Sequence, residues 1–180
     1  MVIATNQNGE LNDIDNCYID ILGKQIVLNI LPDITDQKGA NYVGEPVIGR
    51  SSPMKSYSHS EERTVSMTLH FAITKPGDAR KILDHIRQIQ SAVYPREGNA
   101  DVPFIPPPVC SINCGKLLGD KPLCVVLKSY NIRYPTDVAW DQSEKIYLPV
   151  KVDMETSWDV VYQSSKLPGM ESIMGSGTND

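Results

Sequence analysis

No apolar run in this sequence approaches the length of about 20 residues that a membrane-spanning helix needs. The N-terminal stretch MVIATNQNGELND lacks the charged and then apolar pattern of a secretory signal, so we expect a chain made in the cytoplasm and without a membrane partner. A basic block is missing too: 17 Lys and Arg stand against 22 Asp and Glu, a net charge of −5. Surfaces that bind phosphates or anionic lipid need a clustered basic field, so this composition disfavours both functions.

Residues that would indicate catalysis are few and scattered. His59, His70 and His85 lie far apart in the sequence, without the neighbours of a catalytic triad. His70 falls on the polar side of a predicted strand and His85 beside the apolar stripe of a predicted helix, which favours surface positions for both. We therefore predict a protein that is not an enzyme, with no catalytic residue, no metal ligand and no cofactor.

The 180 residues, 41% apolar and 22% charged, suffice for one sizeable core. We expect a single domain over residues 15–166, preceded by a flexible N-terminal arm at 1–14. The stretch LPGMESIMGSGTND, residues 167–180, has the Gly and Ser content of a flexible C-terminal tail.

Hydrophobic alternation predicts about six strands. CYIDILGKQIVLNIL (17–31) predicts an opening hairpin that turns at Gly23 and Lys24, and RTVSMTLHF (63–71) is the clearest strand. Further strands are predicted in VCSINC, LCVVLKSYNIRY and IYLPVKVDME. The apolar residues expected on the buried faces of the clearest strand and the last strand are Val65, Met67, Leu69 and Phe71, and Ile146, Leu148, Val150, Val152 and Met154.

One amphipathic helix is predicted in DARKILDHIRQIQSAVYP, with Asp78 as a candidate N-cap and an end before Pro95. Its apolar residues at helical spacing are Ile82, Leu83, Ile86, Ile89 and Val93. Strands and helix together predict an α+β fold with mostly antiparallel neighbours. Residues from about 36 to 62 lack periodicity and are predicted to be a long loop, either functional or mobile.

Three of the four cysteines lie close together in the sequence, at positions 110, 114 and 124. If residues 110–114 form a strand, Cys110 and Cys114 are about 13 Å apart, too far to ligate one zinc ion. A cross-strand pair of Cys114 and Cys124 remains possible, because GKLLGDKP can close a hairpin. Buried free thiols are the simplest expectation for a cytoplasmic protein.

Four sequence features follow one another along the chain. A segment of the form GR-x-x-P-x-x-x-Y precedes the clearest strand, the helix leads into a Tyr-Pro, and a proline-rich stretch leads to a strand that ends in glycine. The next strand continues as VLKS, an aromatic residue and a second Tyr-Pro. The matching residues are Gly49, Arg50, Pro53 and Tyr57; Tyr94 and Pro95; Pro106 to Gly115; and Val126 to Tyr130 with Tyr134 and Pro135.

Over roughly residues 15–160, this order resembles baseplate proteins of contractile bacteriophage tails, namely the tube-initiator and hub-adaptor proteins that share the tail-tube fold. The resemblance implies an antiparallel β-sandwich or open barrel with one packed amphipathic helix. It implies a structural virion protein that is assembled in the bacterial host cytoplasm. The partners would be copies of itself in a ring, neighbouring tail tube and hub proteins, and DNA as passing cargo in the lumen.

In such a ring, loops and termini clasp neighbouring subunits, and a neutral or acidic channel wall lets DNA pass. The expected clasps are the long loop at about 36–62 and the tail after Leu167. The residues expected at assembly interfaces are Gly49, Arg50, Pro53, Tyr57, Leu167 and Met170.

Three alternatives remain open at this point. The chain is a hub-to-spike adaptor or a tube terminator, in a phage tail or another contractile injection machine. A different class is a small zinc-binding module with Cys110, Cys114 and Cys124 as ligands. A β-barrel that binds a small ligand is the third, although no cluster of polar residues supports it.

Overall fold

The computed structural model describes residues 17–75, 77–99, 102–142 and 146–162. The predicted N-terminal arm at 1–14 and the predicted tail at 167–180, with Leu167 and Met170, lie outside the described residues. The described part is mostly antiparallel β-sheet with one helix, as the sequence predicts.

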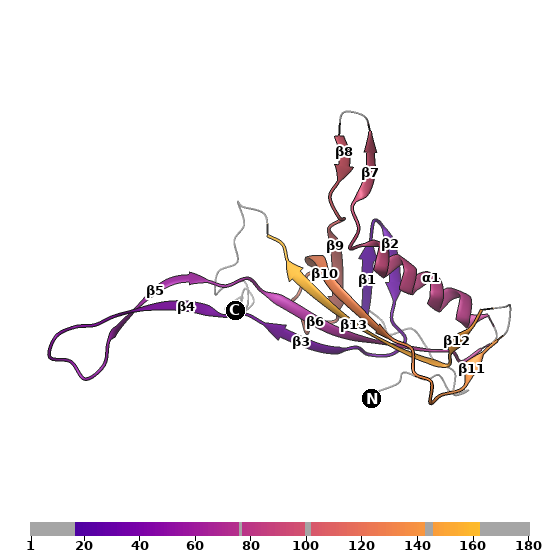
Figure 1. The fold of residues 1–180 in the computed structure, drawn as a ribbon, viewed down its shortest axis with the longest axis horizontal. Coiled ribbons are helices and arrows are strands. Elements are labelled where there is room, and N and C mark those ends of the chain that lie inside the picture. Colours follow the sequence, from indigo (N-terminus) through magenta and orange to yellow (C-terminus); the bar gives the residue numbers. More distant parts are fainter. Residues whose placement is uncertain (1–16, 76, 100–101, 143–145, 163–180) are drawn as a thin grey trace, which may run out of the picture.

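A seven-stranded sheet forms the body of the protein, and every neighbouring pair in it is antiparallel (Figure 1). Its strands, in spatial order, are β2 (Lys24–Val27), β1 (Cys17–Ile21), β9 (Cys110–Cys114), β10 (Leu123–Arg133), β13 (Lys151–Val160), β6 (Thr64–Ala72) and β3 (Asp33–Gln37). The helix α1 (Asp78–Ser91) packs on this sheet, so sheet and helix form the two layers of the body.

Three further pairs of strands form separate two-stranded sheets. They are β4 (Ala40–Glu45) with β5 (Met54–Ser60), β7 (Arg96–Asn99) with β8 (Val102–Ile105), and β11 (Trp140–Asp141) with β12 (Leu148–Pro149). Figure 1 shows the first two pairs projecting from the body in different directions.

The opening hairpin turns one residue earlier than predicted. Ile21 pairs with Lys24, so the two turn residues are Leu22 and Gly23. Both have positive φ angles, 57° and 78°, as a type I′ turn requires. The Gly23 amide also donates to the carboxylate of Asp20 at 2.8 Å, which stabilises the turn.

The core lies between the sheet and the helix. Strand β6 buries Val65, Met67, Leu69 and Phe71, as predicted, and the helix contributes Ile82, Ile86 and Ile89. Trp158 of β13 is fully buried, and its indole N–H donates to the hydroxyl of Thr156 at 2.8 Å. A buried indole with a satisfied donor is the favourable arrangement for this residue.

Two local predictions were wrong. Asp78 is the first helical residue and not the N-cap, which is Gly77 with a φ of 92°. The Asp78 carboxylate instead accepts hydrogen bonds from the backbone amides of Thr74 and Lys75, in the turn before the helix. Val150 lies between β12 and β13 and is exposed, because the alternation of the last strand breaks there.

A bulge in β10 changes which side chains face the core. Val125 and Leu127 are buried, the pairing with β13 slips between Leu127 and Ser129, and the inward positions beyond it are Tyr130 and Ile132. One extra residue, Lys128, therefore reverses the inward parity of the strand.

The prediction of an irregular loop from 36 to 62 was also wrong. Most of this segment is the β4–β5 hairpin, which pairs from Ala40 and Ser60 to Glu45 and Met54. Its residues show no apolar and polar alternation because neither face of the hairpin is buried. A periodicity argument detects a strand only when one face packs on a core.

Candidate assembly surfaces

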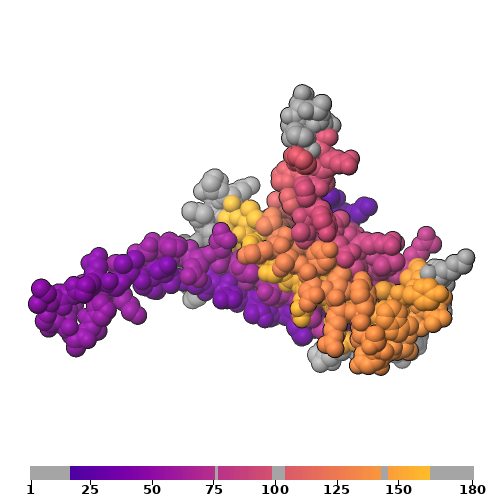
Figure 2. All heavy atoms as spheres, viewed as in Figure 1, coloured from indigo at the N-terminus to yellow at the C-terminus, as the bar shows by residue number. Residues whose placement is uncertain are grey.

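The β4–β5 hairpin, called the arm below and comprising residues 40–60, stands clear of the body (Figure 2). Every residue of both strands is exposed. Several of its exposed side chains are nevertheless large and apolar: Tyr42, Val43, Val47, Ile48, Met54 and Tyr57. Ile48, near the tip, is 103% exposed. The exposed apolar side chains gathered on this element make it a candidate contact surface.

Four of the six interface residues predicted from the sequence lie on this arm. Gly49 and Arg50 form the tip, where Gly49 has a φ of 84° and the Arg50 amide donates to the Val47 carbonyl at 3.2 Å. Pro53 precedes β5. Tyr57 lies opposite Tyr42 across the hairpin, and their rings meet edge to face with centroids 5.9 Å apart. The arm therefore brings these residues onto one extended element.

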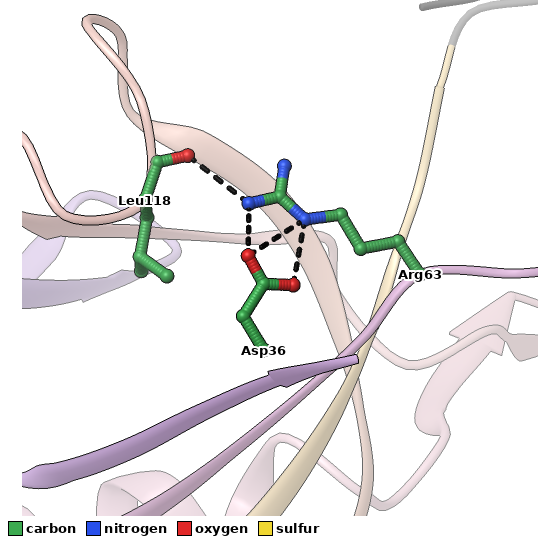
Figure 3. Close-up of polar contacts among 3 residues, drawn as sticks. All are labelled: Asp36, Arg63 and Leu118. Atoms are coloured by element: carbon green, nitrogen blue, oxygen red, sulfur yellow. Dashed lines mark hydrogen bonds and ion pairs between the residues drawn. The ribbon is translucent and has the colours of Figure 1, made fainter. Parts of the chain in front are cut away.

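Arg63, the residue just before β6, binds the segments at the base of the arm (Figure 3). Its Nε donates to both carboxylate oxygens of Asp36, at 2.9 and 3.2 Å, and one terminal nitrogen donates to Asp36 Oδ2 at 2.5 Å. That nitrogen also donates to the Leu118 carbonyl at 3.3 Å. Arg63 is only 9% exposed. The hydrogen bond with Asp36 raises the pKa of Arg63, although burial acts in the opposite direction.

This clamp joins three separate segments: the end of β3, the start of β6 and the loop after β9. Sequence reasoning missed it, although a signal was present. Arg63 has the same parity as Val65 and Met67, so the alternation of this strand already places the arginine on the buried side. A buried arginine needs a carboxylate partner, and Asp36 lies four residues before the arm begins, as Arg63 lies three residues after it ends.

The second projecting hairpin, β7–β8, follows the helix. Glu97 pairs with Phe104 and Arg96 with Ile105. Phe104 is 74% exposed and Tyr94, just before the hairpin, is 59% exposed. This hairpin therefore carries a second set of solvent-exposed apolar side chains.

The face of the sheet away from the helix is polar. Side chains from β3, β6, β13 and β10 stand in rows across it, with Thr35, Ser66, Ser157 and Ser129 in one row and Asp33, Thr68, Glu155 and Asn131 in the next. These residues line a shallow, open depression. Elsewhere on this face two carboxylates are paired with lysines, Asp153 with Lys151 at 3.2 Å and Asp159 with Lys128 at 3.3 Å.

His70 joins two strands on this polar face. Its Nδ1 lies 2.6 Å from a carboxylate oxygen of Asp153, and its Nε2 lies 3.2 Å from one of Asp33. Burial acts to raise the pKa of Asp153, but hydrogen bonds from His70 and Lys151 lower it overall. The two contacts link β13, β6 and β3 through the side chain of one histidine.

Both edges of the large sheet are open among the described strands. β2 pairs only with β1, and β3 pairs only with β6. An open edge presents unpaired backbone donors and acceptors to which another chain can add a strand.

The cysteines are four free thiols, of which only Cys124 is exposed. Residues 110–114 form a strand, as the spacing argument assumed, and Cys110 and Cys114 lie at its two ends. The neighbour of Cys114 is not Cys124 but Cys17, with the two Sγ atoms 2.9 Å apart. Burial raises the pKa of the Cys110 thiol to about 11. Within the described residues, no three His, Cys, Asp or Glu side chains are grouped so as to hold a metal ion.

In the part of the chain that the structure describes, no helix combines the length and the apolar character that crossing a membrane requires. No protein-family model matches this chain, and no curated protein sequence matches it.

Proposed function

We propose that this chain is a non-enzymatic structural subunit of a contractile phage tail baseplate, with a tail-tube-like fold, which forms or joins the ring that starts the tail tube. The observation that carries the proposal is the arm. A two-stranded hairpin is marginally stable in water by itself, and this one exposes apolar side chains along its length. Such an element becomes stable when a neighbouring subunit covers it.

The position of the arm supports a role as a clasp. It projects from the body next to Arg63, whose side chain hydrogen-bonds to Asp36 of β3 and to the Leu118 carbonyl in the loop after β9. These contacts fix the base of the arm to the sheet. The second hairpin projects in another direction, and the two open edges of the sheet provide further contact surfaces. A subunit in a ring needs contacts on opposite sides, one for each neighbour.

The polar face of the sheet is the surface that suits a DNA channel. It combines hydroxyl and amide side chains with carboxylates that are partly neutralised by lysine. A wall of this kind does not retain phosphates, whereas a basic wall would. We propose that this face lines the lumen and that the helix side faces outward.

Hub-to-spike adaptors and tube terminators remain the alternatives within this class, in a phage tail or another contractile injection machine. They share the requirement for projecting contacts but differ in the number of copies per particle. The copy number of this chain in an assembled particle separates them.

Native mass spectrometry of the purified full chain, over a range of concentrations and with and without a chelator, tests the proposal. We expect concentration-dependent ring oligomers whose mass contains no metal. Ile48→Asp at the arm tip should weaken the oligomer at least tenfold, since it places a charge in the covered apolar contact. Ser51→Asp, at an exposed polar position of the same tip, is the matched control and should assemble normally.

A monomer that carries one zinc ion per chain would contradict the proposal and favour a cysteine-metal module. A metal-free monomer at every concentration would exclude a ring of this chain alone. Equal assembly of the Ile48 and Ser51 variants would show that the arm tip is not an interface.

A further inference from the structure

We propose that Cys17 and Cys114 form a redox site, in which a disulfide between β1 and β9 forms when the chain meets a small oxidised disulfide such as glutathione disulfide. The proposal does not depend on the assembly role. It rests on the register of two strands that lie far apart in the sequence.

The two residues are directly opposite each other in the β1–β9 ladder. The carbonyl of Cys17 accepts a hydrogen bond from the Leu28 amide at 3.0 Å, so the backbone groups of Cys17 point toward the β2 side and away from β9. Cys17 and Cys114 are therefore a non-hydrogen-bonded pair, whose Cα atoms lie about 4.5 Å apart. A disulfide usually spans about 4.4–6.8 Å between Cα atoms, so it forms here without moving the strands.

Both side chains point into the core, where their sulfur atoms are 2.9 Å apart. The other two cysteines lack such a partner. Cys110 lies opposite Ile21 on one side and Val125 on the other, and Cys124 lies opposite Ser111. Among the described cysteines, only this pair is in register for a disulfide.

The thiols of the pair differ in acidity. The hydrogen bond with Cys114 lowers the pKa of Cys17, although burial acts to raise it. The same hydrogen bond, together with burial, raises the pKa of Cys114. The hydrogen bond between the two sulfurs therefore stabilises one thiolate within the pair, and this thiolate can attack a disulfide.

The disulfide forms in two steps of thiol–disulfide exchange. The thiolate of one cysteine of the pair attacks one sulfur of glutathione disulfide, and the first glutathione leaves as a thiolate. The other cysteine then attacks the sulfur of the first, and the second glutathione leaves. The two cysteines lose two electrons and two protons, which end on two glutathione thiols. The pair lies at one end of the β1–β9 ladder, so opening of that end admits the oxidant.

The expected consequence is a covalent link across the sheet. The β1–β2 hairpin joins the rest of the sheet through the pairing of β1 with β9. The disulfide would join positions that are 97 residues apart in the sequence. A cross-link that closes so long a loop lowers the entropy of the unfolded chain and thereby stabilises the folded protein.

The test uses the full-length Cys124→Ala variant, which removes the exposed thiol and with it any dimer through that position. The protein is incubated folded in glutathione disulfide, and in parallel refolded from urea in the same buffer. Free thiols are then alkylated and mapped by peptide mass spectrometry, with fragmentation between Cys110 and Cys114. We expect a Cys17–Cys114 link and an alkylated Cys110 in the same molecules.

Oxidation should raise the Tm by several degrees and slow amide exchange in β1 and β2 at least tenfold. Adding Cys17→Ala should abolish both changes, and a reductant should reverse them in the parent protein. Alkylation of both Cys17 and Cys114 in the folded and the refolded samples would overturn the proposal. A disulfide that uses Cys110 would overturn it equally.

Discussion

The body and the arm are built from strands of similar length, but only the body strands bury apolar side chains. In the body, β6 and β13 pair over nine residues and bury a continuous set of apolar side chains against the helix. In the arm, β4 and β5 pair over six positions and bury none of their residues. Hydrogen-bond ladders are present in both regions, so burial makes the difference.

This comparison explains where stability and function separate. Body strands supply the free energy of folding, because their burial removes apolar area from water. Arm strands leave their apolar side chains exposed, and in the proposed ring these side chains contact a neighbouring subunit. The Arg63 clamp lies at the junction between the two regions.

The largest expected effect comes from a charge in the body. Leu69→Asp places a carboxylate at a position that is fully buried in β6, and we expect a loss of about 4 kcal/mol or more in the free energy of unfolding. Val43→Asp makes the same kind of change in the arm, where the side chain is 52% exposed, and should cost less than about 0.5 kcal/mol. Urea unfolding of the two variants measures the contrast. Equal losses would show that arm and body are not energetically distinct.

A smaller loss is expected at the junction. Arg63→Met removes the fork that binds Asp36 and leaves the Leu118 carbonyl without this donor, so we expect a loss of about 2 kcal/mol. The matched Arg63→Lys variant keeps the charge but cannot form the two-pronged contact, and should recover only part of the loss. Urea unfolding gives the totals, and amide exchange shows whether the arm loosens first. If Arg63→Lys were as stable as the parent protein, the positive charge alone would account for the stabilisation at the base of the arm.

Sequence reasoning succeeded where burial imposes a pattern and failed elsewhere. The alternation of β6 predicted Met67 and Leu69 as core residues, and both are buried. The arm escaped prediction because neither of its faces is buried, and the shift in β10 escaped because one residue, Lys128, resets the parity. Cys17 lies opposite Cys114 through a pairing of distant strands, which local spacing does not encode.

A pH-dependent effect of moderate size is expected on the polar face. The pKa of Asp153 is lower in the folded protein than its ordinary value, so its charged form stabilises the fold above pH of about 4, and this contribution is lost as the pH falls through the folded value. Asp153→Asn should therefore cost about 1 kcal/mol at pH 6, and this cost should shrink as the pH falls through the folded pKa of the carboxyl; the figure allows for the partial exposure of the group. Urea unfolding over a series of pH values from 6 downward measures it.

Asp120→Asn is the control for this measurement, since Asp120 is exposed in the loop between β9 and β10. As a substitution of an exposed loop residue, it should change the free energy of unfolding by less than about 0.5 kcal/mol. If Asp153→Asn still lowered the free energy of unfolding by the same amount at low pH, the effect would be due to packing and not to charge.

The smallest effect on stability should come from the aromatic pair of the arm. Tyr57→Ser removes the ring that meets Tyr42 edge to face, a contact worth about 0.5–1.5 kcal/mol within the hairpin. Because the arm opens without unfolding the body, global unfolding should change by less than about 0.5 kcal/mol, while amide exchange in β4 and β5 accelerates several-fold. Lys55→Ser, on the same face of β5, is the control and should change neither. A global loss above about 1 kcal/mol would mean that arm and body unfold as one cooperative unit, and the division drawn between them would fail.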